Sequence, residues 1–140
     1  MSDMQFADPQ LISFPKLGDP SIGYISVTEQ SKLVPFEVQR IFWTYYTPES
    51  IVRGRHAHYL TEQVLIAAAG RIIVTTELAD GTIETFRLED PNTGLYVPPH
   101  AWHTMQYSHS AVQLVLASIP YQEGDYIRDY KEFKRIWQIK

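Results

Sequence analysis

Two histidines separated by a single residue, His56 and His58, are the side chains of this sequence best suited to chemistry. They precede an apolar run at residues 64–69 that predicts a β-strand. In an extended chain, residues two apart project from the same face, so both imidazoles can point into one pocket. An imidazole can move protons near neutral pH or bind a metal ion. The pair therefore predicts either an acid–base site or a metal site.

A third histidine, His103, ends the segment Pro98-Pro-His-Ala-Trp-His103, and Glu62 closely follows the first pair. Three histidines and a carboxylate have the donor types of a divalent-metal site for iron, manganese or zinc. Strand histidines can instead be core residues, although two imidazoles side by side in a core need several polar partners. From the residues alone, a proton-transfer site, a metal site and a core pair all remain open.

The elements that must position these residues are short strands. Residues 24–28, 34–46, 64–69, 72–78, 82–88, 94–97 and 112–118 are rich in the β-branched and aromatic residues that strands favour. Asp80-Gly81 predicts a tight hairpin, and Pro98-Pro99 marks a strand end. Only residues 125–136 have apolar side chains at helical spacing. This pattern predicts an all-β fold, a small β-barrel or two-sheet jelly roll with a C-terminal helix, whose mouth can hold a ligand.

The composition limits the function classes. The chain has 140 residues, of which 44% are hydrophobic and 20% charged, which predicts a single globular domain over residues 1–140. A formal net charge of -4 gives no basic surface for nucleic acid. The absence of cysteine excludes a disulfide framework, a thiolate metal site and a cysteine nucleophile. No signal-peptide pattern and no run of roughly 20 apolar residues is present, so we expect a soluble cytoplasmic protein that does not enter a membrane.

Several motifs together carry a more specific resemblance. They are Arg53-Gly-Arg-His-Ala-His58, Glu62-Gln-Val-Leu65, Gly94-Leu-Tyr-Val97, Trp102-His-x-Met105, Val115-Leu-Ala-Ser118 and Asp125-Tyr-Ile-Arg-x-Tyr130. In this combination the chain resembles the nucleotide-sugar 3,4-ketoisomerases, and the match runs from about residue 23 to residue 134. The resemblance implies a cupin-type jelly roll and an enzyme that acts on dTDP-4-keto-6-deoxyglucose. It also implies a reaction without a metal or other cofactor, in which the paired histidines move protons.

The resemblance gives each site residue an expected role. His56 would remove the proton on carbon 3 of the sugar, and His58 would relay a proton between the two oxygens of an enediol. His58 or His103 would stabilise the developing enolate oxygen. Arg40 and Arg53 would bind the diphosphate, because guanidinium matches phosphate oxygens well, although each can equally be a surface strand arginine.

Three further expectations concern Trp102, the product and the oligomeric state. Trp102 would wall the sugar pocket, although a strand tryptophan is more often a core residue. The imidazole of His103 would favour the galacto-configured 3-keto product, whereas Ile22 departs from the Arg or Tyr that the family tends to carry near the active site. We also expect a homodimer, with the apolar amino-terminal residues laid across a partner: Phe6, Leu11, Ile12 and Phe14.

Two other functions remain alternatives. A metal-dependent cupin enzyme would use the histidines as ligands, and a non-catalytic sugar-binding cupin would bind a nucleotide sugar without turnover. The resemblance favours the ketoisomerase over both.

Overall fold

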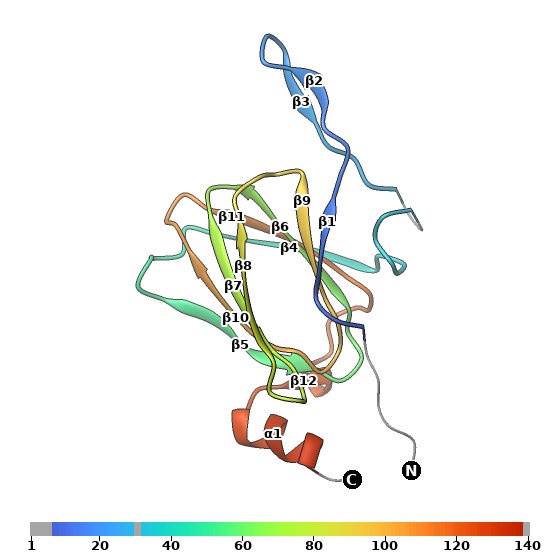
Figure 1. Cartoon of the computed structure of the whole chain (residues 1–140), viewed down its shortest axis with the longest axis vertical. Coiled ribbons are helices and arrows are strands. Elements are labelled where there is room, and N and C mark those ends of the chain that lie inside the picture. Colours follow the sequence, from blue (N-terminus) through green and yellow to red (C-terminus); the bar gives the residue numbers. More distant parts are fainter. Residues whose placement is uncertain (1–6, 30–31, 139–140) are drawn as a thin grey trace.

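Two antiparallel five-stranded sheets face each other in a jelly roll in the computed structural model, which describes residues 7–29 and 32–138 (Figure 1). The first sheet has the order β1 (Gln10–Ser13), β9 (Thr93–Val97), β6 (Gln63–Ala69), β11 (Val112–Ala117) and β4 (Arg40–Tyr45). The second has the order β12 (Tyr126–Ile127), β5 (Val52–His58), β10 (Trp102–Tyr107), β7 (Ile72–Glu77) and β8 (Ile83–Leu88). The predicted all-β architecture with a C-terminal helix is confirmed.

The main core fills the space between the two sheets. It contains Leu65, Val74, Leu95 and Val115, which alternate along their strands with residues facing outward. A second apolar cluster covers the outer face of the first sheet, where Phe14 and Val34 pack on Val64 and Ile66. Strand β6 is therefore buried on both faces, which explains its continuous apolar sequence.

Three predicted elements had boundaries wrong by more than one residue. The strand expected at residues 24–28 is β3 (Gly23–Ile25). The strand expected at residues 34–46 begins at Arg40, because the preceding apolar residues pack as irregular chain against the first sheet. The helix expected at residues 125–136 is α1 (Tyr130–Gln138), preceded by a short 3-10 turn, η1 (Glu123–Asp125), and by β12. Asp129 starts α1: its carboxylate accepts a hydrogen bond from the Lys131 N–H, and its carbonyl accepts one from Phe133.

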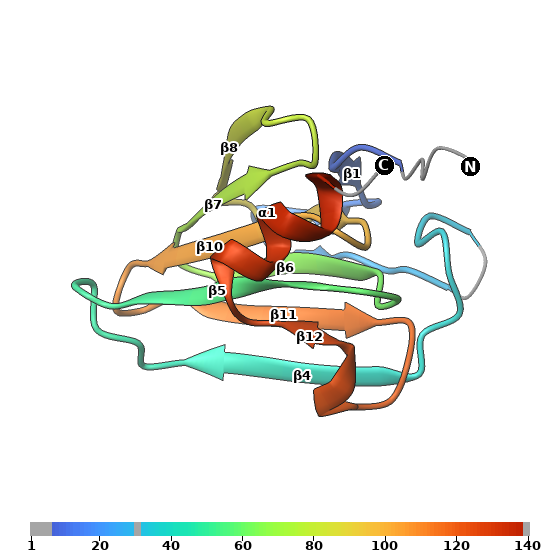
Figure 2. The same cartoon turned by 90° about the horizontal axis from the view of Figure 1, so that it is seen from below.

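Helix α1 lies against the outer side of the second sheet at one end of the barrel, beside β5 and β12 (Figure 2). Phe133 is fully buried there with Ala57 and Ile127. On its exposed side, Tyr130 and Lys134 both contact the carboxylate of Glu77 at 2.9 and 3.0 Å. These contacts hold α1, which directly follows β12, and β12 pairs with the histidine strand β5.

A separate hairpin, β2 (Leu17–Asp19) with β3 (Gly23–Ile25), projects from the barrel at the end opposite α1 (Figure 1). Its side chains are exposed although several are apolar, and Ile22 at the turn is 80% exposed. The hairpin therefore presents apolar surface that nothing in its own chain covers among the described residues.

Candidate active site

Three histidines meet inside the barrel. His56 and His58 come from β5, and His103 comes from the neighbouring strand β10. The ring centroids lie 5.0 Å apart for His56 and His58, and 4.6 Å apart for His56 and His103. One nitrogen of each ring lies within 4.8 Å of the others. The spacing of two along β5 and the register with β10 bring these rings together, as the sequence predicted for the first pair.

A β-bulge in β5 sets which residues share this inner face. Gly54 and Arg55 both have positive φ, 84° and 59°, and the register with β10 shifts between His103 and Thr104. As a result, Arg53 pairs with Met105, whose side chain is in the barrel core, while His56 pairs with His103. Arg53 and His56 therefore lie on the same side of the strand although three positions separate them.

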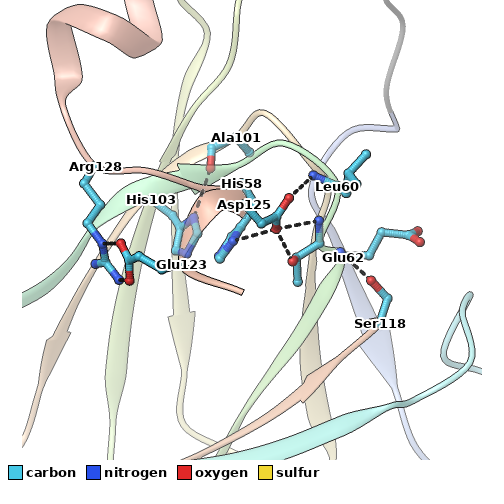
Figure 3. Close-up of polar contacts among 10 residues, drawn as sticks. His58, Leu60, Glu62, Ala101, His103, Ser118, Glu123, Asp125 and Arg128 are labelled. Carbon is cyan, nitrogen blue, oxygen red and sulfur yellow. Dashed lines mark hydrogen bonds and ion pairs between the residues drawn. The ribbon is translucent and has the colours of Figure 1, made fainter. Parts of the chain in front are cut away.

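Burial keeps the histidines neutral. Burial, with smaller contributions from the neighbouring His103 and His58, lowers the pKa of His56 to about 2. Burial also lowers the pKa of His58 to about 3, with smaller contributions from His103 and Arg40. Burial likewise lowers the pKa of His103, whose Nδ1 lies 3.0 Å from the Ala101 carbonyl (Figure 3). Neutral imidazoles at physiological pH have a free lone pair that can accept a proton or bind a metal.

Arg40 faces the histidines from the opposite sheet. It pairs with the buried Ala117 on β11, so its side chain points into the barrel. The guanidinium carbon lies 5.1 Å from the ring centroid of Phe42 and 5.5 Å from that of Tyr121. Its Nε is buried and has no hydrogen-bond partner among the described residues. Arg40 thus places a guanidinium group, with an Nε–H that no described residue accepts, next to His58.

Asp125 lies directly behind His58. Its Oδ2 is 3.3 Å from His58 Nδ1, and both side chains are almost completely buried (Figure 3). The carboxylate also accepts hydrogen bonds from the Leu60 N–H at 2.7 Å, the Thr61 N–H at 3.2 Å and the Thr61 hydroxyl. The 3.3 Å contact has ion-pair distance without the alignment of a hydrogen bond.

An aromatic ring closes the histidine cluster at the end of the barrel. The ring of Tyr126 lies 4.4 Å from that of His58 and 5.1 Å from that of His56. It also contacts Arg128, whose guanidinium carbon is 4.2 Å from the ring centroid. Arg128 is held in turn by Glu123 through two hydrogen bonds of 2.6 and 3.0 Å (Figure 3).

Two residues that the sequence suggested for the site lie elsewhere. Trp102 packs outside the sheet, with its ring 5.3 Å from Tyr130 and 5.6 Å from Phe133 of α1. Trp102 therefore packs against α1 as a structural residue, which is one of the two interpretations that the sequence left open. Glu62 accepts a hydrogen bond of 2.7 Å from Tyr96 and is not part of the histidine cluster. The group of possible metal ligands in the described residues is thus limited to the three histidines.

Sequence reasoning missed Asp125 and Tyr126 as site residues. Both were assigned to the helix, because apolar residues recur at helical spacing beyond them. The available signal was the Asp125-Tyr-Ile-Arg128 string, which formed part of the family resemblance.

Comparison with known proteins agrees with this architecture. Residues 7–138 match the family model described as "FdtA: WxcM-like, C-terminal". A TDP-4-oxo-6-deoxy-alpha-D-glucose-3,4-oxoisomerase of Aneurinibacillus thermoaerophilus is 41% identical over 128 residues, which cover 90% of each chain. This chain belongs to the sugar 3,4-ketoisomerase family. The sequence resemblance is thereby confirmed.

Solved structures show how closely this ketoisomerase keeps the family fold. A 3,4-ketoisomerase from Helicobacter canadensis is 36% identical, with a TM-score of 0.88 over 94% of this chain and 98% of that chain. A sugar 3,4-ketoisomerase from Thermoanaerobacterium thermosaccharolyticum in complex with TDP is 32% identical, with a TM-score of 0.88 over 93% and 94% of the two chains. A variant of that enzyme is in complex with TDP-4-keto-6-deoxyglucose. The chain is therefore a nucleotide-sugar 3,4-ketoisomerase. Among the described residues, no helix is long and apolar enough to cross a membrane.

Proposed function

We propose that this ketoisomerase moves the keto group of dTDP-4-keto-6-deoxyglucose from carbon 4 to carbon 3, with His56 as the base and His58 as the proton relay. The observation that carries the proposal is the pair of neutral imidazoles on the inner face of β5, 5.0 Å apart. The substrate follows from the Aneurinibacillus relative and from the sugar bound to the Thermoanaerobacterium variant.

The chemistry needs proton transfers at adjacent carbons. His56 removes the proton on carbon 3, which the neighbouring carbonyl acidifies, and the electron pair forms the carbon 3–carbon 4 double bond of an enediolate. His58 takes the proton from the hydroxyl on carbon 3 and delivers it to the oxygen on carbon 4. A proton then returns to carbon 4, and the carbonyl re-forms at carbon 3. A positioned acid–base group of this kind accelerates a reaction by roughly 10²–10⁴-fold.

Two arginines fit the diphosphate of the substrate. Arg40 lies in the barrel near His58 and has an unpaired buried Nε among the described residues. Arg53 is exposed and lies on the same face of β5 as His56. A chain with a net charge of -4 needs local cations to hold a doubly charged ligand, and guanidinium is well suited to phosphate oxygens.

For the product we favour dTDP-3-keto-6-deoxygalactose, a precursor of 3-amino-3,6-dideoxygalactose. The argument rests on His103, whose imidazole is shorter than the guanidinium of relatives with the gluco outcome and leaves more room beside the sugar. His103 is 1% exposed and lies within the histidine cluster rather than at the barrel mouth. Its Nε2 is left to face the ligand because Nδ1 is directed to the Ala101 carbonyl.

The ketoisomerase is also proposed to act as a homodimer. Strand β4 turns Ile41, Trp43 and Tyr45 outward with more than half of each side chain exposed, at 53%, 60% and 55%. A cleft of about 550 Å³ opens on the outer face of the same sheet, between Phe14, Tyr24 and Leu114. Exposed apolar surface of this kind on an edge strand and a projecting hairpin is typical of an interface.

The hairpin supports the same conclusion. The family position of Ile22 lies near an active site, yet the hairpin carries Ile22 to the end of the barrel opposite α1, away from β12 and the histidines (Figure 1). We therefore propose that Ile22 approaches the active site of a second copy of the chain. Of the four amino-terminal residues expected to cover a partner, Ile12 and Phe14 pack on their own chain, Leu11 is exposed, and Phe6 lies outside the described residues.

One observation supports a second candidate. Nitrogens of His56, His58 and His103 lie within 4.8 Å of one another, so the cluster has the donors of a three-histidine metal site. A metal-dependent isomerase would contain near-stoichiometric metal and would lose activity with a chelator. The acid–base proposal predicts full turnover by chelator-treated protein.

The proposed function is tested by incubating the purified protein with dTDP-4-keto-6-deoxyglucose and following the sugar by NMR. We expect a 3-keto sugar to accumulate, and reductive trapping then gives the configuration at carbon 4. Unchanged substrate after prolonged incubation would contradict the proposal, and a gluco product would contradict the argument from His103 alone.

A further inference from the structure

We propose that Asp125 is a positioning residue that fixes the tautomer of His58, with the proton on Nδ1 and the lone pair of Nε2 directed into the barrel. The inference rests on the proposed function of His58 and gives it a specific geometry. It assigns a role to a buried carboxylate that the proton transfers themselves do not use.

The first observation is the contact itself. Asp125 Oδ2 lies 3.3 Å from His58 Nδ1, and the two side chains are 4% and 2% exposed. The contact is not aligned as a hydrogen bond, but an ionised carboxylate repels a lone pair and attracts an N–H, so it favours the proton on the nitrogen that faces it. Both ring nitrogens are buried and have no hydrogen-bond partner among the described residues; Nδ1 faces Asp125, which leaves Nε2 available to the ligand (Figure 3).

The second observation is how firmly the carboxylate is held. Oδ1 accepts from the Leu60 N–H, while Oδ2 accepts from the N–H and the hydroxyl of Thr61. The backbone carbonyl of Asp125 accepts from the Tyr59 N–H at 2.9 Å. All of these donors belong to the segment that directly follows His58. The carboxylate is therefore held in place by the turn that follows His58, beside the Nδ1 edge of the ring.

The fixed tautomer determines how the relay works. With the proton on Nδ1, facing the Asp125 carboxylate, His58 must accept and release the relayed proton at Nε2. Nε2 takes the proton from the oxygen on carbon 3, and the resulting imidazolium is stabilised by the adjacent carboxylate. Nε2 then returns the same proton to the oxygen on carbon 4, and the neutral tautomer is restored. Because the two oxygens are on neighbouring carbons, one nitrogen can reach both.

The substitution Asp125→Asn separates this role from a structural one. Asparagine has a single acceptor oxygen, and an amide NH₂ in place of Oδ2 would donate to His58 Nδ1 and reverse the tautomer. We expect kcat to fall by at least about 100-fold, with KM within about threefold of wild type, because positioning is lost and binding is not. Asp129→Asn is the matched control: it makes the same carboxylate-to-amide change at the exposed start of α1, outside the histidine cluster, so we expect kcat and the tautomer of His58 to be unchanged.

The tautomer is measured directly by long-range ¹H–¹⁵N NMR of the wild-type and Asp125→Asn proteins labelled at histidine. We expect a protonated Nδ1 and an unprotonated Nε2 for His58 in the wild type, and the reverse in the variant. An unprotonated Nδ1 in the wild type would overturn the proposal, even where the variant fails to fold. So would an Asp125→Asn enzyme with wild-type kcat. A wild-type protein with the expected tautomer and no isomerase activity would refute the proposed function but not this assignment.

Discussion

The imidazole rings of His56 and His103 face each other across neighbouring strands, in register and 4.6 Å apart. Two cationic rings could not occupy these positions, because each would repel the other in a buried site. The folded structure is therefore compatible only with a state in which the two rings are not both charged. The contact also makes the stability of the protein depend on pH.

Acidification should destabilise the protein before its carboxylates titrate. The pKa of His56 is lowered from 6.5 to about 2 and that of His58 to about 3, so between pH 6.5 and 5 the unfolded chain takes up protons that the folded chain does not. The free energy of unfolding should fall in this interval by up to about 1.4 kcal/mol per pH unit for each histidine. Urea denaturation at several pH values measures this slope. A His56→Asn/His58→Asn variant should show a shallower slope, and a flat wild-type profile would contradict neutral burial.

Gly54 should tolerate no side chain. It has a φ of 84°, and an added Cβ would lie 2.8 Å from the His103 carbonyl oxygen. Gly54→Ala should therefore cost about 1–3 kcal/mol in backbone strain and also displace β5 from β10, lowering activity with it. Gly81→Ala is the control, since its φ of 90° is equally strained but no atom lies within 4 Å. Thermal melts should show that both variants lose stability through backbone strain. Turnover assays should show a loss of activity in Gly54→Ala alone.

Arg40 should contribute mainly to binding. Removing a charge-assisted contact to phosphate costs about 1.5–3 kcal/mol, so Arg40→Ala should raise KM by roughly 10- to 100-fold with a smaller change in kcat. Arg87→Ala is a suitable control, because Arg87 is exposed on β8 and paired with Glu89. An Arg40→Ala enzyme with wild-type KM would remove Arg40 from the proposed diphosphate site.

The dimer should depend on the outward face of β4. Trp43 is 60% exposed there, and Trp43→Glu would place a charge in the proposed interface. Light scattering should give a dimer for the wild type at micromolar concentration and a shift toward monomer for the variant. Ile83→Glu, on β8 and 63% exposed, is the matched control and should remain dimeric. A wild type that is monomeric throughout would contradict the homodimer.

The sequence predicted the parts of the site that depend on strand periodicity. His56 and His58 share a face because the chain between them is extended, and most strand segments could be recognised from their β-branched and aromatic residues. The common face of Arg53 and His56 could not be predicted, because it depends on the bulge at Gly54 and Arg55. A simple alternation would place those two side chains on opposite faces.

Tertiary contacts determine the features that the sequence did not predict, namely the start of the C-terminal helix and the environment of Trp102. Helical spacing predicted a helix from Asp125, but the carboxylate of Asp125 is bound by Leu60 and Thr61, far away in sequence, and the following residues pair with β5. This long-range bonding outweighs the local helical pattern. Trp102 similarly could not be assigned from its neighbours, since its environment is set by α1.

The most direct test of the central claim is turnover of dTDP-4-keto-6-deoxyglucose in D₂O by the wild type, His56→Ala and His58→Asn, followed by NMR. The account predicts that the wild type forms a 3-keto sugar. His56→Ala should keep its fold by circular dichroism but lose both isomerisation and loss of the proton on carbon 3, by about 10²–10⁴-fold. His58→Asn should lose isomerisation to a similar degree. Near wild-type turnover by both variants would contradict the assignment of proton transfer to these two histidines.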